Sequence, residues 1–154
     1  MPTKKTLFME TTTVPAERTA AEISSVLIQA GATQIATDYE AGRIVGLRWS
    51  MRVYGRDLLF QMPARVDPIY KILRSRKKGY LGQKDEQDLK TRAHRVAWRQ
   101  LLRWIQAQVA MIDCGMTEAT EVFLPYMQTN SGQSLFDALK GSEFKQLAPP
   151  ERPS

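Results

Sequence analysis

The sequence of 154 residues has one cysteine, one histidine and no long apolar run, and each scarcity excludes a class of protein. A lone Cys114 cannot build a disulfide framework, and Cys114 with His94 cannot supply the four ligands of a structural zinc site. No segment approaches the roughly 18 uncharged residues of a membrane span. The first residues also lack the apolar stretch and cleavage site of a signal peptide. We therefore expect a soluble, cytoplasmic protein that makes no contact with a membrane.

Groups for catalysis are equally scarce. His94 has no partner that would make it a general base or a metal ligand, and no glycine-rich phosphate loop occurs. The sequence therefore predicts no catalytic residue, no metal site and no cofactor. One alternative remains open, in which Asp38, Glu40 and Asp57 meet across a sheet as the carboxylates of a two-metal nuclease. Carboxylates exposed to solvent in turns and strands are the simpler interpretation of these three residues.

Basic residues are concentrated in the middle of the chain. The sequence carries a net charge of +6. Residues 43–103 hold sixteen basic and five acidic side chains, whereas residues 1–42 and 104–154 are each net acidic. Such an asymmetry favours an anionic partner, although acidic ends that fold back on the middle would neutralise it.

Hydrophobic periodicity predicts a single α+β domain over residues 1–147 with a disordered tail at 148–154. Its core is a three-stranded antiparallel meander within 33–63, packed against a long C-terminal helix and a shorter N-terminal helix. The predicted elements are a strand at 7–14, a helix at 19–30 that begins with a Thr19–Glu22 capping box, a helix from Asp67, a loop at 79–87, a long helix at 88–114, a helix from Thr117 to Leu124, and a short helix from Ser134 to Gly141.

The central strand of the meander has one apolar and one polar face. Strict alternation places the apolar side chains from Val45 to Val53 on the core side. The same alternation places Arg48 and Arg52 on the opposite, solvent-facing side.

The long helix carries an arginine ridge, which we define as Arg92, Arg95, Arg99 and Arg103. At 100° per residue these four side chains fall within an arc of roughly 80° and rise over roughly 16 Å. Planar guanidinium groups bind phosphate oxygens in pairs, so the ridge is a candidate phosphate-binding face. The competing interpretation is internal ion pairing with carboxylates elsewhere in the chain, for which the candidates are Asp38, Glu40, Glu118 and Glu121.

Further basic residues extend the predicted nucleic-acid-binding set. Arg48 and Arg52 add two guanidiniums from the sheet, and Arg76, Lys77 and Lys78 form a cluster at the end of a helix. The helix dipole alone would favour cations at that end. The tryptophans are predicted to lie in the core, with Trp98 the one closest to the ridge.

Two segments, residues 13–32 and 95–127, resemble a family of small uncharacterised proteins encoded by phages, prophages and other mobile elements. The resemblance covers about residues 11–140 and implies a genetic context without an established chemistry. The layout of a meander followed by an arginine-bearing helix is also similar to phage single-strand annealing proteins, which form rings or filaments. The order helix, three strands, helix is likewise that of double-stranded RNA-binding domains.

Together these features predict a non-catalytic, largely sequence-tolerant binder of DNA or RNA, with single-strand binding or annealing and homo-oligomer formation as expectations. The alternative is a protein-interaction module that inhibits or regulates a host or mobile-element protein. Its candidate surface is the apolar segment 123–127, which would otherwise close the core.

Overall fold

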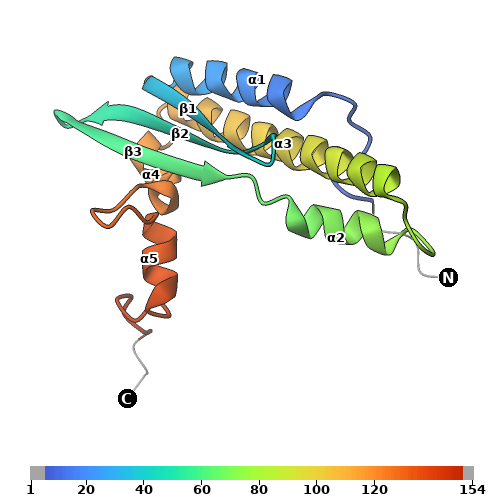
Figure 1. Ribbon diagram of the computed structural model, residues 1–154. Helices are drawn as coiled ribbons and strands as arrows, with labels where there is room; N and C mark the ends of the chain where they lie inside the picture. The colour runs from blue at the N-terminus through green and yellow to red at the C-terminus, as the bar shows by residue number, and fades with distance from the viewer. Residues whose placement is uncertain (1–5, 151–154) are drawn as a thin grey trace.

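The computed structural model describes residues 6–150 and confirms the predicted α+β class. Three antiparallel strands form one sheet in the order β1-β2-β3, with the helices α1 and α3 packed against it (Figure 1). Of the tail expected at 148–154, residues 151–154 lie outside the described part of the chain. The elements are α1 (Ala16–Gln29), β1 (Ala32–Glu40), β2 (Arg43–Val53), β3 (Arg56–Pro63), α2 (Asp67–Ser75), α3 (Gln83–Asp113), α4 (Ala119–Val122), the 3₁₀ helix η1 (Leu124–Tyr126) and α5 (Leu135–Gly141).

Two tight hairpins connect the strands. Both central residues of each turn have positive φ: 51° and 78° at Ala41 and Gly42, and 50° and 75° at Tyr54 and Gly55. Positive φ at both positions is typical of the two-residue turns whose twist matches that of paired strands. The meander predicted within 33–63 is therefore confirmed, with each connection as short as a hairpin allows.

A register shift in β2 corrects the predicted face of its first residues. Asp38 pairs with Gly46, but the next residue of β1, Tyr39, pairs with Ile44, so Val45 is an extra residue in a β-bulge. On the N-terminal side of the bulge, the side chains of β2 alternate in the opposite phase to the rest of the strand. Ile44 is consequently buried in the core, whereas Val45, which strict alternation placed there, is only half-buried.

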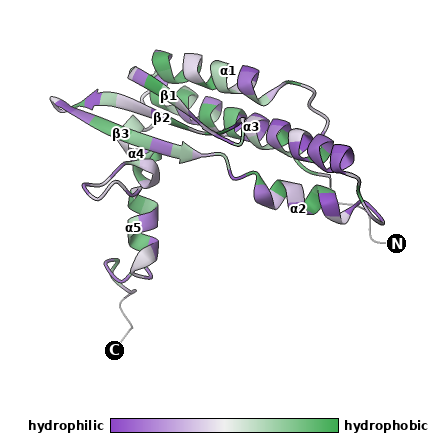
Figure 2. Ribbon diagram, viewed as in Figure 1, coloured by the Kyte–Doolittle hydropathy of each residue, from purple (hydrophilic) through white to green (hydrophobic). Residues whose placement is uncertain are grey.

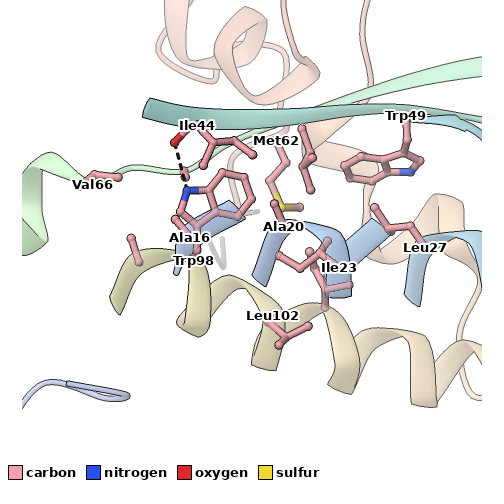
Figure 3. Close-up of a cluster of buried hydrophobic side chains, with 14 of the residues drawn as sticks. Ala16, Ala20, Ile23, Leu27, Ile44, Trp49, Met62, Val66, Trp98 and Leu102 are labelled. Atoms are coloured by element: carbon pink, nitrogen blue, oxygen red, sulfur yellow. Dashed lines mark hydrogen bonds between the residues drawn. The ribbon is translucent and has the colours of Figure 1, made fainter. Parts of the chain in front are cut away.

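The core lies between the sheet and the helices α1 and α3. Figure 3 shows Ile23 and Leu27 of α1 and Leu102 of α3 gathered beneath the strands. Trp98 is fully buried there, and its indole Nε1 donates a hydrogen bond of 3.2 Å to the carbonyl oxygen of Ile44 (Figure 3). This bond joins α3 to the bulged start of β2 and satisfies a polar atom that burial would otherwise penalise.

The C-terminal elements close one end of this core. Phe123, between α4 and η1, is fully buried, and its ring packs edge-on against Trp49 at 5.4 Å between centroids. The backbone nitrogen of Gln128 donates to the carbonyl oxygen of Leu59 on β3 at 2.7 Å. Ser134 caps α5 by accepting a hydrogen bond from the nitrogen of Asp137, as expected for a serine at that position.

The N-terminal segment is not the strand that its threonine content predicted. Residues 8–11 form turns, with hydrogen bonds from Glu10 N to Leu7 O and from Thr12 N to Met9 O, and the segment pairs with no strand among the described residues. The threonines of this segment give it β propensity, but a strand forms only where a neighbouring strand can pair with its backbone through hydrogen bonds.

Four predicted helix boundaries also change. The helix predicted from Thr117 to Leu124 is limited to α4 (Ala119–Val122), and Leu124 belongs to the 3₁₀ helix η1. α1 begins at Ala16, so Thr19 and Glu22 lie inside the helix and form no capping box. α2 begins at Asp67 with Val66 rather than Asp67 as its N-cap. α3 begins at Gln83, five residues before the predicted start, so it includes half of the expected loop. Within residues 6–150 none of these helices is both long and apolar enough to cross a membrane.

Candidate functional site

The middle of the arginine ridge lies at the contact between α3 and α1, where Arg99 is bound by residues of α1. Arg99 donates from Nη1 to the carboxylate of Glu22 at 2.8 Å and to the hydroxyl of Thr19 at 3.3 Å. Its side chain is only 13% exposed. The internal pairing that the sequence left open therefore exists for Arg99. Its partner on α1 is not one of the four carboxylates that the sequence offered.

The other three ridge residues each meet a different environment. A hydrogen bond from Arg76, and more weakly the charge of Arg92, holds the pKa of Glu10 below its ordinary value. Arg92 itself lines a hollow together with Lys77 and Asp88. Arg95 is half-buried, and its Nε has no hydrogen-bond partner among the described residues. Arg103 is exposed and donates to Gln106 at 2.8 Å. The ridge is therefore divided among several local sites.

The two sheet arginines project from the solvent-facing side of β2, as predicted, but each pairs with a carboxylate on a neighbouring strand. The Nε of Arg48 lies 3.0 Å from both carboxylate oxygens of Asp38, a contact that raises the pKa of Arg48. Arg52 donates to Asp57 at 3.2 Å. All four side chains are largely exposed, and such pairs contribute little stability. A competing anion would therefore displace them at small cost.

Those pairs also bear on the nuclease alternative. Asp38 and Asp57 each bind an arginine, on different parts of the sheet. Across residues 6–150 there is no group of three histidine, cysteine or acidic side chains placed to hold a metal ion. The structure thus gives that alternative no geometric support.

A further basic surface is the basic corner, which we define as residues 74–84, from the end of α2 to the first turn of α3. Arg76 forms an ion pair with Glu10, whereas Lys77, Lys78 and Lys84 are exposed and form no ion pair with any described residue. Figure 2 shows hydrophilic residues gathered on this corner and on the N-terminal half of α3.

An aromatic side chain that the sequence analysis passed over stands in the middle of the basic corner. Tyr80 is 94% exposed, more than any other large hydrophobic residue of the described chain. Arg74 shapes the loop beneath it by donating to the carbonyl oxygens of Lys77 at 3.4 Å and Gly79 at 3.3 Å. The available signal was local: Tyr80 follows two lysines and Gly79, whose φ of +80° allows a sharp turn.

The remaining candidates are accounted for by packing. Trp98 is buried, so it offers no stacking surface, and the Nδ1 of His94 bonds the carbonyl oxygen of Lys90 at 2.9 Å. Cys114 is a free cysteine, exposed at the end of α3. Phe123, the first residue of the apolar segment 123–127, lies in the core, and within the segment Leu124 and Pro125 are the exposed residues.

Comparisons with known proteins add no assignment. A scan against protein-family models and searches of curated proteins and of solved structures each found no significant match to this chain.

Proposed function

We propose that this protein binds the sugar–phosphate backbone of DNA or RNA without catalysis and with little sequence preference, through the basic corner rather than through the arginine ridge. The observation that carries the proposal is the exposed Tyr80 beside two exposed lysines, Lys77 and Lys78. Neither lysine forms an ion pair within residues 6–150. Phosphates are attracted by lysines, and any base stacks on an exposed aromatic ring.

The charges around the corner indicate the side of approach. Asp85 and Asp88 lie on one flank, where they line a hollow of about 370 Å³ together with Lys77 and Arg92. Two carboxylates repel a phosphate, so a strand would pass over Lys77, Lys78 and Tyr80 on the side away from Asp85 and Asp88. A single loop presents few donors, and neither contacts to phosphates nor stacking on Tyr80 read the sequence of the bases. This geometry favours weak binding that depends on salt and tolerates any sequence.

The experiment measures the affinity for a fluorescently labelled single-stranded oligonucleotide by anisotropy at several salt concentrations. Replacing Lys77 and Lys78 by glutamine should flatten the slope of log affinity against log salt by roughly 1.4, which corresponds to two phosphate contacts at about 0.7 each. Tyr80→Ala should weaken binding about tenfold and leave the slope unchanged, because stacking releases no counterions.

A matched control carries the same loss of charge at a distant place. Lys140→Gln with Lys145→Gln removes two exposed cations at and beyond α5 and should leave both affinity and slope near the wild-type values. If this control and the corner variant change binding equally, only net charge matters and the corner is not a site. A duplex and an RNA of the same sequence, measured in parallel, identify the preferred form.

The ridge prediction is tested in the same assay. Replacing Arg92 and Arg103 by glutamine removes two ridge charges and spares the partly buried ion pair of Arg99. If that variant flattens the salt slope and the corner variant does not, the ridge is the binding face and the basic corner is wrong. Annealing activity requires nucleic-acid binding, so it is tested only after this experiment has shown binding. The expected mobile-element origin does not depend on which surface binds.

A further inference from the structure

A small cavity opens where the start of α1, the start of β2 and the middle of α3 meet. Its volume is about 140 Å³, and its wall includes residues 15–17, Arg43, Thr91, His94 and Arg95. That volume is roughly ten times what one water molecule needs, so it accommodates a tetrahedral oxyanion. The cavity is distinct from the basic corner, with which it shares no lining residue.

Arg95 brings an unsatisfied cation to this cavity. Its Nε is buried and has no hydrogen-bond partner, and the guanidinium forms no ion pair with any described residue. A buried donor on a charged group is costly when it is left unpaired. Arg99, one turn further along α3, shows the contrast, because a carboxylate and a hydroxyl of α1 satisfy it.

Arg43 supplies a second cation that is held in position but not neutralised. It donates to the hydroxyl of Thr91 at 2.8 Å and to the side-chain and backbone oxygens of Gln87 at 3.1 and 3.3 Å. All three acceptors are neutral, so the full positive charge of Arg43 remains available. The bonds fix its guanidinium in place, which lowers the entropic cost of binding an anion.

The start of α1 adds backbone hydrogen-bond donors and partial positive charge. Its N-cap is Pro15, and no side chain caps the helix, so the backbone N–H groups of the first turn lack side-chain acceptors. The helix dipole also places partial positive charge there. Glu17 is the single acidic residue of the lining, and it forms no ion pair within residues 6–150.

From this combination we infer that the cavity binds a phosphate group, which accepts hydrogen bonds from Arg43 and Arg95 and from the backbone N–H groups of the first turn of α1. The phosphate is either the free inorganic ion or the terminal phosphate of a nucleic-acid strand. Only the second source rests on the proposed function. Arginine pairs with phosphate in a fork of two hydrogen bonds, and helix N-termini bind the same anion.

The first arm of the test uses inorganic phosphate alone. Titration of the purified protein, followed by calorimetry and by the melting temperature at constant ionic strength with chloride as the balancing anion, should show saturable binding. Arg95→Gln should weaken it at least tenfold. Glu17→Gln should tighten phosphate binding several-fold, because the substitution removes the one negative charge of the lining. A misfolded variant would bind less tightly, so a gain in affinity cannot result from misfolding.

Arg103→Gln is the matched control, since it removes the same charge from the same helix outside the cavity. It should bind phosphate as the wild type does. Absence of saturable binding by the wild type overturns the inference, as does an equal loss in the Arg95 and Arg103 variants. Weaker binding by Glu17→Gln would also overturn it.

The second arm distinguishes the sources with two oligonucleotides that differ only in a 5′-phosphate. If the cavity takes a strand terminus, the phosphorylated strand binds about tenfold more tightly, and Arg95→Gln removes the difference. Equal binding assigns the cavity to free phosphate. The variant with Lys77 and Lys78 replaced should retain inorganic phosphate binding, so failure of the basic corner and failure of the cavity give different results.

Discussion

Removing the Arg99–Glu22 ion pair should destabilise the protein measurably. The side chain of Arg99 is 13% and that of Glu22 39% exposed, so the pair is partly shielded from water. Hydrogen bonds to charged groups contribute about 1.5–3 kcal/mol, and partial exposure moves the expectation to about 2 kcal/mol for Arg99→Gln. In a chain of this size that corresponds to a melting temperature lower by about 4–8 °C. The exposed Arg103→Gln should change stability by less than about 0.5 kcal/mol.

A double-mutant cycle isolates the pair from the loss of each residue alone. Urea denaturation of Arg99→Gln, Glu22→Gln and the double variant should give a coupling free energy of about 1 kcal/mol. A coupling below about 0.3 kcal/mol, which is the usual error of additivity, would mean that the pair contributes nothing. An increase in stability on Arg99→Gln would show that repulsion within the ridge outweighs the pairing, and the reasoning from burial would fail.

Three further changes test other parts of the fold. Trp98→Phe should cost about 1 kcal/mol more than Trp49→Phe in urea denaturation, because only the indole of Trp98 donates a hydrogen bond, to a main-chain carbonyl of β2. The pKa of Glu10 is lowered beside Arg76, so the ionised carboxylate stabilises the fold above the unfolded-state pKa of about 4.3. This stabilisation is lost as the pH falls through the lower folded-state pKa. The melting temperature of Glu10→Gln, measured as a function of pH, should lack this pH dependence. Gly46→Ala should lower the melting temperature, because an added Cβ would lie 3.1 Å from the carbonyl oxygen of Met62, and an unchanged melting temperature would show that the sheet yields there.

Much of the fold was predictable because the hydrophobic period changes clearly along the chain. Alternation over the meander and helical spacing before and after it were enough for the class and the strand order. The alternation gave no sign of the bulge at Val45, because a bulge is set by pairing with β1 and not by the residues of β2 alone. Threonines at 11–13 misled for the same reason, since a strand requires a partner.

The site was less predictable than the fold. A helical wheel placed four arginines on one stripe, but it contains no information on which element covers that stripe. Thr19 and Glu22 matched the spacing of a capping box, yet they serve Arg99 across the α1–α3 contact. Tyr80 was missed because exposure is a tertiary property: the same residue type at position 70 is half-buried against α3.

The N-terminal segment has a consequence for the order in which the protein opens. Its tertiary hydrogen bonds span long stretches of sequence: Gln100 donates to Phe8 O at 2.8 Å, and Arg76 binds Glu10. Closing loops of that length is entropically costly, and the backbone bonds of the segment are local turns. Residues 7–12 therefore form a unit that detaches while the sheet stays intact, so their amides should exchange with deuterium through local opening, and those of β2 through global unfolding. Each such opening briefly uncovers Gln100 on the side of α3 opposite Trp98, and it exposes the backbone of residues 7–12 to proteases.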